Sequence, residues 1–205
     1  MSVVRENIEV MNDAHATTRL LLTPLTVDDV DDMFRVYGDE RTWRHLPTGR
    51  HLDRGQTARS IENAVQSRSV HGFGMNAVRL REPVGPLAAG RFVGVAGANM
   101  MAMGAWNLGY RFEPEAWGHG LAGETARLSY AAAVASAPDA PVTARVFANN
   151  PVSIRVLERL GLDLAWRGSS GVEPLGGGDT THLERLVFTD RKLDDEILDA
   201  IIALG

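Results

Sequence analysis

A glycine-rich turn in the middle of the chain constrains this sequence more than any other feature. Residues 110–125 read Tyr-Arg-Phe-Glu-Pro-Glu-Ala-Trp-Gly-His-Gly-Leu-Ala-Gly-Glu-Thr, which predicts a strand, a short spacer, a glycine turn and the start of a helix. The first N–H groups of a helix have no partners within the helix, and the helix dipole favours negative charge beside them. The sequence therefore predicts a site for phosphate oxygens where this helix begins.

The same glycines also match a second kind of site. Gly118, Gly120 and Gly123 spell the G-x-G-x-x-G pattern of dinucleotide-binding folds. In those folds the glycines follow directly on the first strand, and an acidic residue about 20 residues later binds the ribose. Here residues 113–117 separate the strand from the glycines, and the next predicted strand, residues 141–147, contains no carboxylate. A dinucleotide-dependent oxidoreductase is therefore only a remote alternative.

The composition narrows the classes of function. With 205 residues, 44% of them hydrophobic and 23% charged, the chain is expected to form one globular domain. Its net charge of -5 gives no electrostatic reason to expect nucleic acid or an acidic membrane as a partner. The absence of cysteine excludes disulfides, thiolate metal sites and a cysteine-bound intermediate.

Targeting and metal signals are also missing from the sequence. Residues 1–15 contain no apolar stretch of the kind found in signal peptides, and no apolar run approaches the roughly 18 residues of a membrane span. We therefore expect a cytoplasmic protein. His45 and His51 lie six residues apart, which is not a ligand spacing, and no His-Glu-x-x-His motif occurs, so no metal site is expected.

Hydrophobic spacing and turn residues predict a mixed α/β order of elements. Strands are expected over residues 19–25, 73–80, 92–100, 106–112, 142–147, 162–166 and 183–188, and helices over residues 26–37, 56–66, 119–136, 150–160 and 194–204. The predicted inner face of the second helix is Ala58, Ile61 and Val65, and that of the third is Leu121, Thr125, Leu128 and Ala132. Asn150, Pro151 and Gly161 are typical of the start and end of the fourth helix.

Three segments together resemble a known family. They are residues 108–125, residues 149–162 (Asn-Asn-Pro-Val-Ser-Ile-Arg-Val-Leu-Glu-Arg-Leu-Gly-Leu) and residues 43–49 (Trp-Arg-His-Leu-Pro-Thr-Gly). In this order and separation they resemble the GNAT superfamily of acetyl-CoA-dependent N-acetyltransferases, particularly its RimJ/RimL-like branch, over about residues 18–188. The resemblance implies a central mixed, splayed sheet of about six to seven strands with helices on both faces.

The domain organisation follows from this resemblance. Residues 1–17 are expected to be an N-terminal lead-in, and residues 18–190 a GNAT-like acetyltransferase domain. Residues 191–205 are expected to form an amphipathic C-terminal helix. Its apolar face, made of Ile197, Leu198, Ile201 and Ile202, predicts packing on the same domain or on a partner subunit in a homodimer.

The resemblance places acetyl-CoA on the glycine turn and on the strand before it. The family pattern asks for Arg or Gln, two residues, Gly, one residue, then Gly or Ala; here those positions are Trp117, Gly120 and Ala122, so the first departs. Because main-chain N–H groups would bind the phosphates, a change of side chain at position 117 should matter little. The cofactor-binding residues implied are Tyr110, Arg111, Phe112, Trp117, Gly118, His119, Gly120, Leu121, Ala122, Gly123, Asn150 and Ser153. The strand backbone would polarise the thioester carbonyl as an oxyanion hole does, while its side chains alternate into a core.

Asn150 and Ser153 have two interpretations. Asn before Pro is an ordinary helix cap, and a serine three residues later lies in the first helical turn. By resemblance, Asn150 also binds CoA and Ser153 lies near the thiol sulfur. Several family members carry a tyrosine four residues after this serine as the acid for the leaving thiolate, and this chain has Leu157 there. Ser153 is therefore the candidate that hydrogen-bonds the departing sulfur.

The general base is harder to identify. Some members carry a carboxylate where this chain has Asn107, which cannot accept a proton. At pH 7, deprotonating a lysine amine of pKa about 10.4 costs about 4.6 kcal/mol, whereas an α-amine of pKa about 7.7 costs about 1 kcal/mol. The expected acceptor is therefore an N-terminal amine or a small amine of low pKa. Glu173 and His71 are candidate bases, with a solvated loop residue as the alternative for each.

The resemblance implies an acetyltransferase. The acetyl group of acetyl-CoA would pass to a primary amine by direct attack within a ternary complex, with Trp43 and His45 on the acceptor side. Trp43 has the alternative of merely fixing its loop. A catalytically silent acyl-CoA-binding regulatory module is the alternative from another class, because both Asn107 and Leu157 depart from the family pattern.

Overall fold

A computed structural model of the chain describes residues 9–11, 14–45, 49–169 and 184–204. Its strands and helices follow the order that the sequence predicts, preceded by two short strands. In chain order they are β1 (Glu9–Met11), β2 (Ala14–Ala16), β3 (Leu20–Pro24), α1 (Val30–Tyr37), α2 (Arg54–His71), β4 (Asn76–Leu80), β5 (Phe92–Met100), β6 (Trp106–Phe112), α3 (Leu121–Ser136), β7 (Val142–Phe147), α4 (Pro151–Leu160), β8 (Asp163–Ser169), β9 (Glu184–Thr189) and α5 (Asp195–Ala203). Short 3-10 turns lie at Val27–Asp29, Glu40–Trp43 and Pro114–Ala116.

The described strands form one mixed sheet in the order β1-β2-β3-β4-β5-β6-β7-β9-β8. All neighbouring strands run antiparallel except β6 and β7, which are parallel. The mixed α/β fold is confirmed, with nine strands in place of the expected six to seven. The two additional strands lie within residues 1–17, where the sequence predicts a lead-in. Strands of three residues are too short to show a period, and β2 is held by backbone pairing of His15 and Ala16 with β3.

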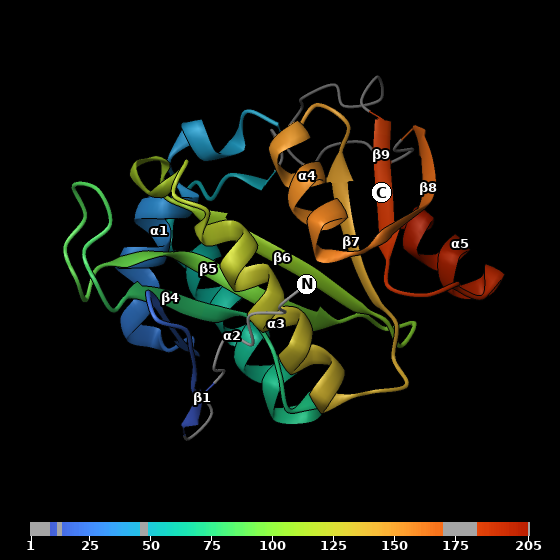
Figure 1. Cartoon of the computed structure of the whole chain (residues 1–205), viewed down its shortest axis with the longest axis horizontal. Coiled ribbons are helices and arrows are strands. Elements are labelled where there is room, and N and C mark those ends of the chain that lie inside the picture. The colour runs from blue at the N-terminus through green and yellow to red at the C-terminus, as the bar shows by residue number, and fades with distance from the viewer. Residues whose placement is uncertain (1–8, 12–13, 46–48, 170–183, 205) are drawn as a thin grey trace, which may run out of the picture.

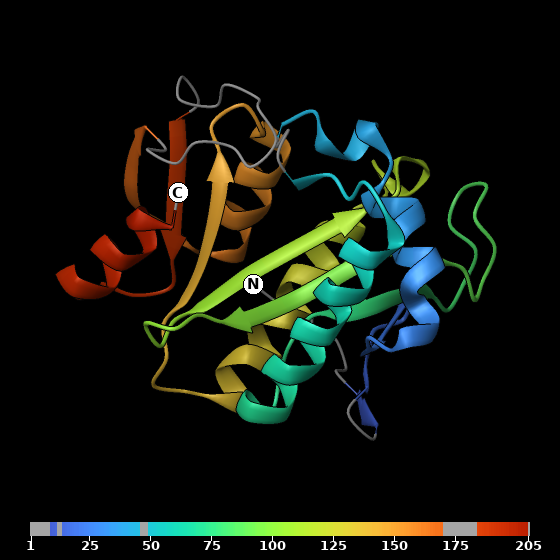
Figure 2. The same ribbon diagram turned by 180° about the vertical axis from the view of Figure 1, so that it is seen from behind.

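The sheet opens between β6 and β7. Their parallel ladder contains only two pairs, Trp106 with Val142 and Asn107 with Thr143. Beyond these pairs β6 continues to Phe112 and β7 to Phe147 without pairing with each other, and Figure 2 shows the two strands diverging. The facing edges therefore carry peptide groups that no strand ladder uses, and such groups need other partners.

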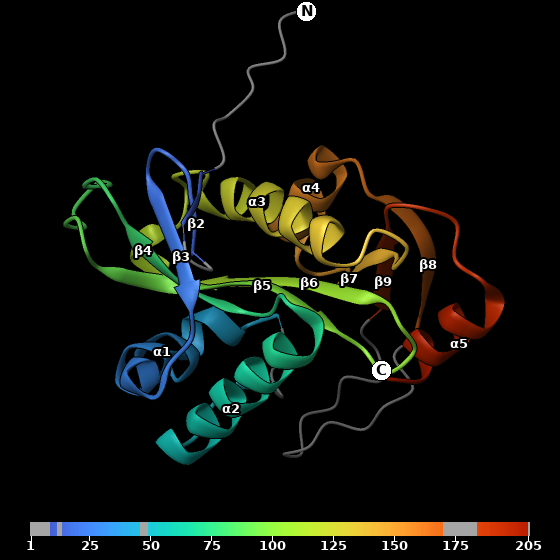
Figure 3. The same cartoon turned by 90° about the horizontal axis from the view of Figure 1, so that it is seen from below.

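Helices cover both faces of the sheet. Figures 1 and 3 show α3 and α4 on one face, and Figures 2 and 3 show α1 and α2 on the other. Side chains of β6 alternate between these layers. Leu108 packs with Leu157 of α4 in one core cluster, whereas Val95 of β5 packs with Val36 and Ile61 of α1 and α2 in another.

The helix patterns hold with two corrections. The predicted inner face of α3 is confirmed, because Leu121, Thr125, Leu128 and Ala132 are all buried. The second helix is longer than predicted, ending at His71, where Gly72 takes the left-handed conformation with φ of 76°. Val65 is 49% exposed, so its assignment to the inner face is wrong, because α2 buries the face of Thr57, Ile61 and Ala64 instead.

The C-terminal helix packs on its own domain. Ile201 is fully buried in a cluster with Ala105, Val187 and Leu193. The described contacts of α5 are with its own domain, and packing on a partner subunit stays a prediction. Among the helices of the described residues, none combines the length and the apolar character that crossing a membrane requires.

Candidate active site

The glycine turn before α3 is an open backbone loop. Gly118 and Gly120 have φ of 82° and 77°, a region that strongly favours glycine, and Gly120 is the N-cap of α3. A Cβ atom on Gly118 would meet nothing within 4 Å, and one on Gly120 would meet only Arg19 Nη2 at 3.9 Å. Backbone conformation, not crowding, therefore requires these glycines. Among the described hydrogen bonds none uses the N–H groups of residues 118–123, so they are placed to bind an anion.

A buried carboxylate fixes this turn to the start of β3. Glu124, in the first turn of α3, is 6% exposed and accepts hydrogen bonds from Arg19 Nε at 2.9 Å and from the hydroxyl of Thr17. Arg19 Nη1 also donates to the carbonyl of His119 at 3.0 Å. Arg19 thus connects the turn to the helix that follows it, which limits the movement of the N–H groups between them.

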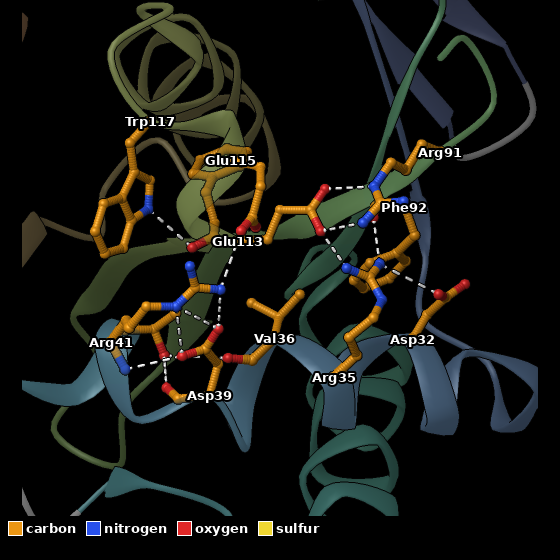
Figure 4. A network of polar contacts seen from close by, with 12 residues as sticks. Asp32, Arg35, Val36, Asp39, Arg41, Arg91, Phe92, Glu113, Glu115 and Trp117 are labelled. Carbon is orange, nitrogen blue, oxygen red and sulfur yellow. Dashed lines mark hydrogen bonds and ion pairs between the residues drawn. The ribbon is translucent and has the colours of Figure 1, made fainter. Parts of the chain in front are cut away.

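A second network holds the segment between β6 and the turn (Figure 4). Glu113 is 2% exposed and accepts from Arg91 Nε at 2.6 Å and Nη2 at 2.8 Å, and from Arg35 Nη1. Burial alone would raise the pKa of Glu113, but the hydrogen bonds and charges of Arg91 and Arg35 outweigh it and lower that pKa. The carboxylate therefore stays ionised between two guanidinium groups.

Trp117 is directed back to the strand. Its indole Nε1 donates to the carbonyl of Phe112 at 3.0 Å, and the residue is 50% exposed. The neighbouring Glu115 forms an ion pair of 3.0 Å with Arg41, which also binds Asp39. The side chains of this spacer therefore hold the turn in place, while its backbone leads into the glycines.

A cavity of about 290 Å³ lies at the opening between β6 and β7. Residues from both faces of the sheet line it. Asn150, Ser153 and Leu157 come from the cap and helix of α4, and Trp43 and His45 come from the loop after α1. Its size is just below the range for small-molecule sites, which is about 300–1,000 Å³.

Tyr110 and Ser153 meet in this cavity. The hydroxyl groups of the two residues are 2.8 Å apart, and Asn150 Oδ1 accepts from the N–H of Ser153 at 3.2 Å. Burial raises the pKa of Tyr110 to about 12, against the opposing effect of the Ser153 hydrogen bond, so the phenol is protonated at neutral pH. Asn150 is both a helix cap and a cavity residue, so its two interpretations are compatible. The sequence assigns Tyr110 a core side chain and gives no sign of this contact.

Arg111 occupies the other side of the sheet. Its Cζ lies 3.4 Å from the ring centroid of Trp43 and 5.4 Å from that of Tyr37, and Nη1 donates to the carbonyl of Thr42. Trp43 Nε1 donates to the carbonyl of Tyr37 at 2.5 Å. Trp43 therefore both fixes its loop and lines the cavity. Since the chain alternates along β6, Arg111 and Tyr110 face opposite layers.

His45 lines the same side of the cavity. Burial, and then the charge of Arg111, lower the pKa of His45 below its ordinary value of 6.5. The imidazole is therefore neutral at pH 7. Sequence reasoning placed Trp43 and His45 on one side, and the structure brings them together with Arg111.

The two candidate bases do not join this group. His71 is exposed at the end of α2, and its ring centroid lies 6.3 Å from that of Trp106, at the paired end of β6 and β7. It does not line the cavity. Glu173 lies outside the described residues. Within the described part of the chain, no group of three or more His, Cys, Asp or Glu side chains could hold a metal ion.

Comparison with known proteins identifies similar chains. A family model described as an acetyltransferase (GNAT) domain matches residues 19–163. No curated protein matches the sequence.

Solved structures share the fold at low identity. An acetyltransferase from Agrobacterium tumefaciens has 22% identity and a TM-score of 0.66, covering 92% of this chain and 99% of that one. RimL, a ribosomal L7/L12 α-N-protein acetyltransferase solved in complex with coenzyme A, has 14% identity and a TM-score of 0.68, covering 87% and 96%. The microcin C7 self-immunity acetyltransferase MccE, solved with acetyl-CoA and AMP, has 9% identity and a TM-score of 0.65, covering 84% and 92%.

Proposed function

We propose that this chain, which belongs to the GNAT acetyltransferase family, transfers an acetyl group from acetyl-CoA to a primary amine. The observation that carries the proposal is the continuity of the site. The site consists of three adjoining parts: the glycine turn with its open N–H groups, the facing edges of β6 and β7 that are not paired with each other, and the hydroxyl pair of Tyr110 and Ser153 inside the opening. The complexes of RimL with coenzyme A and of MccE with acetyl-CoA support acetyl-CoA as the ligand.

Acetyl-CoA would bind from the α3 and α4 side. The N–H groups of residues 118–123 would hold the diphosphate, aided by the positive end of the α3 dipole, which contributes about 0.3–1 kcal/mol. The carbonyl of Phe112 is taken by Trp117 Nε1, and the remaining peptide groups on the free edge of β6 from Leu108 are offered to the pantetheine arm. One of these N–H groups would hydrogen-bond the thioester oxygen as it gains negative charge.

The reaction exchanges a carbon–sulfur bond for a carbon–nitrogen bond and moves one proton. The lone pair of the amine attacks the thioester carbonyl carbon, a C–N bond forms, and the C–S bond then breaks to release coenzyme A. The nitrogen loses a proton, and the departing thiolate gains one to become the thiol.

Tyr110 and Ser153 would stabilise the departing sulfur. A serine hydroxyl can accept a hydrogen bond from the phenol and donate its own proton to the sulfur at the same time. Because the pKa of Tyr110 is raised to about 12 and that of a thiol is about 8.5, the phenol acts here as a hydrogen-bond donor and keeps its proton. This pair would stabilise the leaving thiolate in place of the tyrosine that several family members carry at the position of Leu157.

The amine acceptor is proposed to have a low pKa. None of the described residues that line the cavity is a carboxylate, and Asn107 cannot accept a proton. An N-terminal α-amine costs about 1 kcal/mol to deprotonate at pH 7, compared with about 4.6 kcal/mol for lysine. Holding this amine beside the thioester would then supply much of the rate acceleration. Glu173 as a base, the cytoplasmic location and a homodimer stay predictions.

A silent acyl-CoA-binding module is the second candidate function. It is favoured by Leu157, a buried residue at the position where several family members carry a tyrosine that acts as the acid; Leu157 is 2% exposed. The family match gives no support to a dinucleotide-dependent oxidoreductase.

Amine-dependent release of coenzyme A separates the two candidates. A thiol-reactive dye measures this release with no background from the protein, because the chain contains no cysteine. Release that depends on both acetyl-CoA and an amine supports the transferase. Binding of acetyl-CoA without release, across a panel of amines and peptides, would leave the binding module.

A further inference from the structure

The acceptor side of the cavity is lined by three arginines from three strands. They are Arg111 of β6, Arg145 of β7 and Arg185 of β9. Phe147 pairs directly with Arg185 across β7 and β9, and Arg145 lies two residues before Phe147 on β7. The side chains of Arg145, Phe147 and Arg185 therefore share a face of the sheet. None of the described residues that line the cavity is Asp or Glu.

The contacts of Arg111 and Arg185 attract their positive charge but do not neutralise it. Arg111 stacks on Trp43 and Tyr37 and donates to a backbone carbonyl. The Cζ of Arg185 lies 4.5 Å from the ring centroid of Phe147, and its buried Nε has no hydrogen-bond partner among the described residues. Aromatic faces and carbonyls attract a cation but carry no net negative charge.

The electrostatics of the cavity agree with this geometry. Burial, and then the charge of Arg145, lower the pKa of Arg185 to about 10. Burial also lowers the pKa of Arg111, and Tyr37 opposes this only in part. Both groups remain charged at pH 7, and desolvated charges are costly unless a counter-charge is supplied. The chain as a whole has a net charge of -5, so this cationic wall is local.

The phosphates of acetyl-CoA do not account for these arginines. The glycine turn leads into α3, which covers the face of the sheet that carries Tyr110. Arg111 lies on the opposite face, against the loop after α1. A ligand that reaches the three arginines therefore enters from the acceptor side.

We propose that the amine acceptor carries an oxyanion, a carboxylate or a phosphate, close to its amine, and that Arg111 and Arg185 bind it. This inference rests on the proposed function, since it names the acceptor class of the same cavity. Arginine suits this role because its planar fork matches the geometry of carboxylate and phosphate. A free amino acid, an aminoalkyl phosphate and a peptide with an acidic first residue share this chemistry.

The same wall would assist the chemistry. Nearby positive charges disfavour the ammonium form of the acceptor and so lower its pKa. An acceptor with only an ammonium group would be repelled, whereas one with an adjacent oxyanion would be attracted. The cationic wall therefore selects the acceptor, and the positive charge that the bound oxyanion leaves uncompensated increases the fraction of its amine that is neutral.

Matched pairs of acceptors test the proposal. Coenzyme A release is measured with an amino acid and its amide, with aspartyl and asparaginyl peptides of otherwise identical sequence, and with an aminoalkyl phosphate and the corresponding amino alcohol. We expect kcat/KM to be at least tenfold higher for the anionic member of one or more pairs, and the pair that responds identifies the source. Equal values within every pair would overturn the proposal and leave the transferase standing.

A binding measurement covers a chain that does not turn over. Calorimetry with the protein–coenzyme A complex compares the same pairs without chemistry. Tighter binding of the anionic members would support the proposal even if the transferase assignment fails, and equal or undetectable binding of both members would overturn it.

Variants connect the preference to named residues. We expect Arg185→Gln and Arg111→Gln each to lower kcat/KM for the anionic acceptor by about tenfold to 150-fold, as loss of a hydrogen bond to a charged group predicts. Because the neutral member has no oxyanion to lose, the ratio of kcat/KM for the anionic over the neutral member should fall in both variants. Arg54→Gln is the control, because Arg54 is an exposed arginine paired with Asp31 that does not line the cavity. Wild-type preference in both cavity variants, with melting temperatures near wild type, would overturn the proposal.

Discussion

Glu113→Gln is the perturbation whose effect follows most directly from the structure. The wild-type carboxylate is 2% exposed and accepts from two nitrogens of Arg91 and one of Arg35, at the junction between β6 and the glycine turn. Glutamine has nearly the same shape but has no charge, and its amide nitrogen would face a guanidinium group. The variant therefore removes the ionic contribution and leaves the packing almost unchanged.

The expected loss of unfolding free energy is about 2–3 kcal/mol. Removing one partner of a fully buried ion pair costs about 3–5 kcal/mol, and removing one from an exposed pair costs about 0–1 kcal/mol. Arg35 and Arg91 are 38% and 41% exposed, so water can solvate them again, and the glutamine oxygen keeps part of the bonding. For a domain of this size the loss corresponds to a decrease in Tm of about 4–12 °C.

The assay is urea unfolding across pH, with Glu115→Gln as the control. Glu115 pairs with Arg41 at 43% and 47% exposure, so its change should cost less than about 1 kcal/mol. The pKa of Glu113 is lowered in the fold because Arg91 and Arg35 outweigh its burial. Its stabilisation is therefore complete above the ordinary pKa of about 4.5 and is lost as the pH falls through the lowered pKa. A Glu113→Gln variant whose unfolding free energy lies within about 0.5 kcal/mol of wild type at pH 7, or is no lower than that of Glu115→Gln, would refute this reasoning.

The remaining predictions concern the site. Gly120→Glu should weaken binding of coenzyme A, because φ is 77° there and a carboxylate would repel phosphate; unchanged affinity by calorimetry would place the phosphates elsewhere. Ser153→Ala and Tyr110→Phe should each lower kcat by about tenfold with little change in KM for acetyl-CoA, and the double variant should be little worse than either one, since the two hydroxyls act as a unit. Independent, multiplying effects would contradict this. The pKa values of His45 and His51 are lowered, chiefly by burial and then by Arg111, so the unfolded chain binds protons more readily than the fold. The unfolding free energy should therefore be highest above about pH 6.5 and should decrease as the pH falls through the lowered pKa values. This decrease should be smaller in the double variant His45→Gln/His51→Gln. An unfolding free energy that stays constant between about pH 7.5 and 5.5 would exclude this prediction.

Local signals in the sequence predicted much of the fold. The cap, first position and end of α4 are visible in Asn150, Pro151 and Gly161, because each acts through its own backbone conformation. The buried face of α3 follows from helical spacing. The exposed position of Val65 did not follow, because two neighbouring faces of α2 carry apolar residues and only the packing on α1 and β5 selects one.

The site depended more on contacts between distant residues. Tyr110 and Ser153 lie 43 positions apart, and their contact requires the opening of β6 and β7, which no local pattern encodes. Arg111 and Arg185 share a face only through the register of three strands. His71 was selected by its chemistry alone, and the length of α2 places it at the closed end of the sheet.

A crystal structure of the protein with bound coenzyme A tests the central claim most directly. The account predicts diphosphate oxygens within about 3.2 Å of N–H groups of residues 118–123, and the thiol sulfur beside the hydroxyl of Ser153 in the opening between β6 and β7. A diphosphate bound to Arg111 and Arg185 instead, with the glycine turn empty, would contradict both the assigned ligand path and the assignment of an acceptor side.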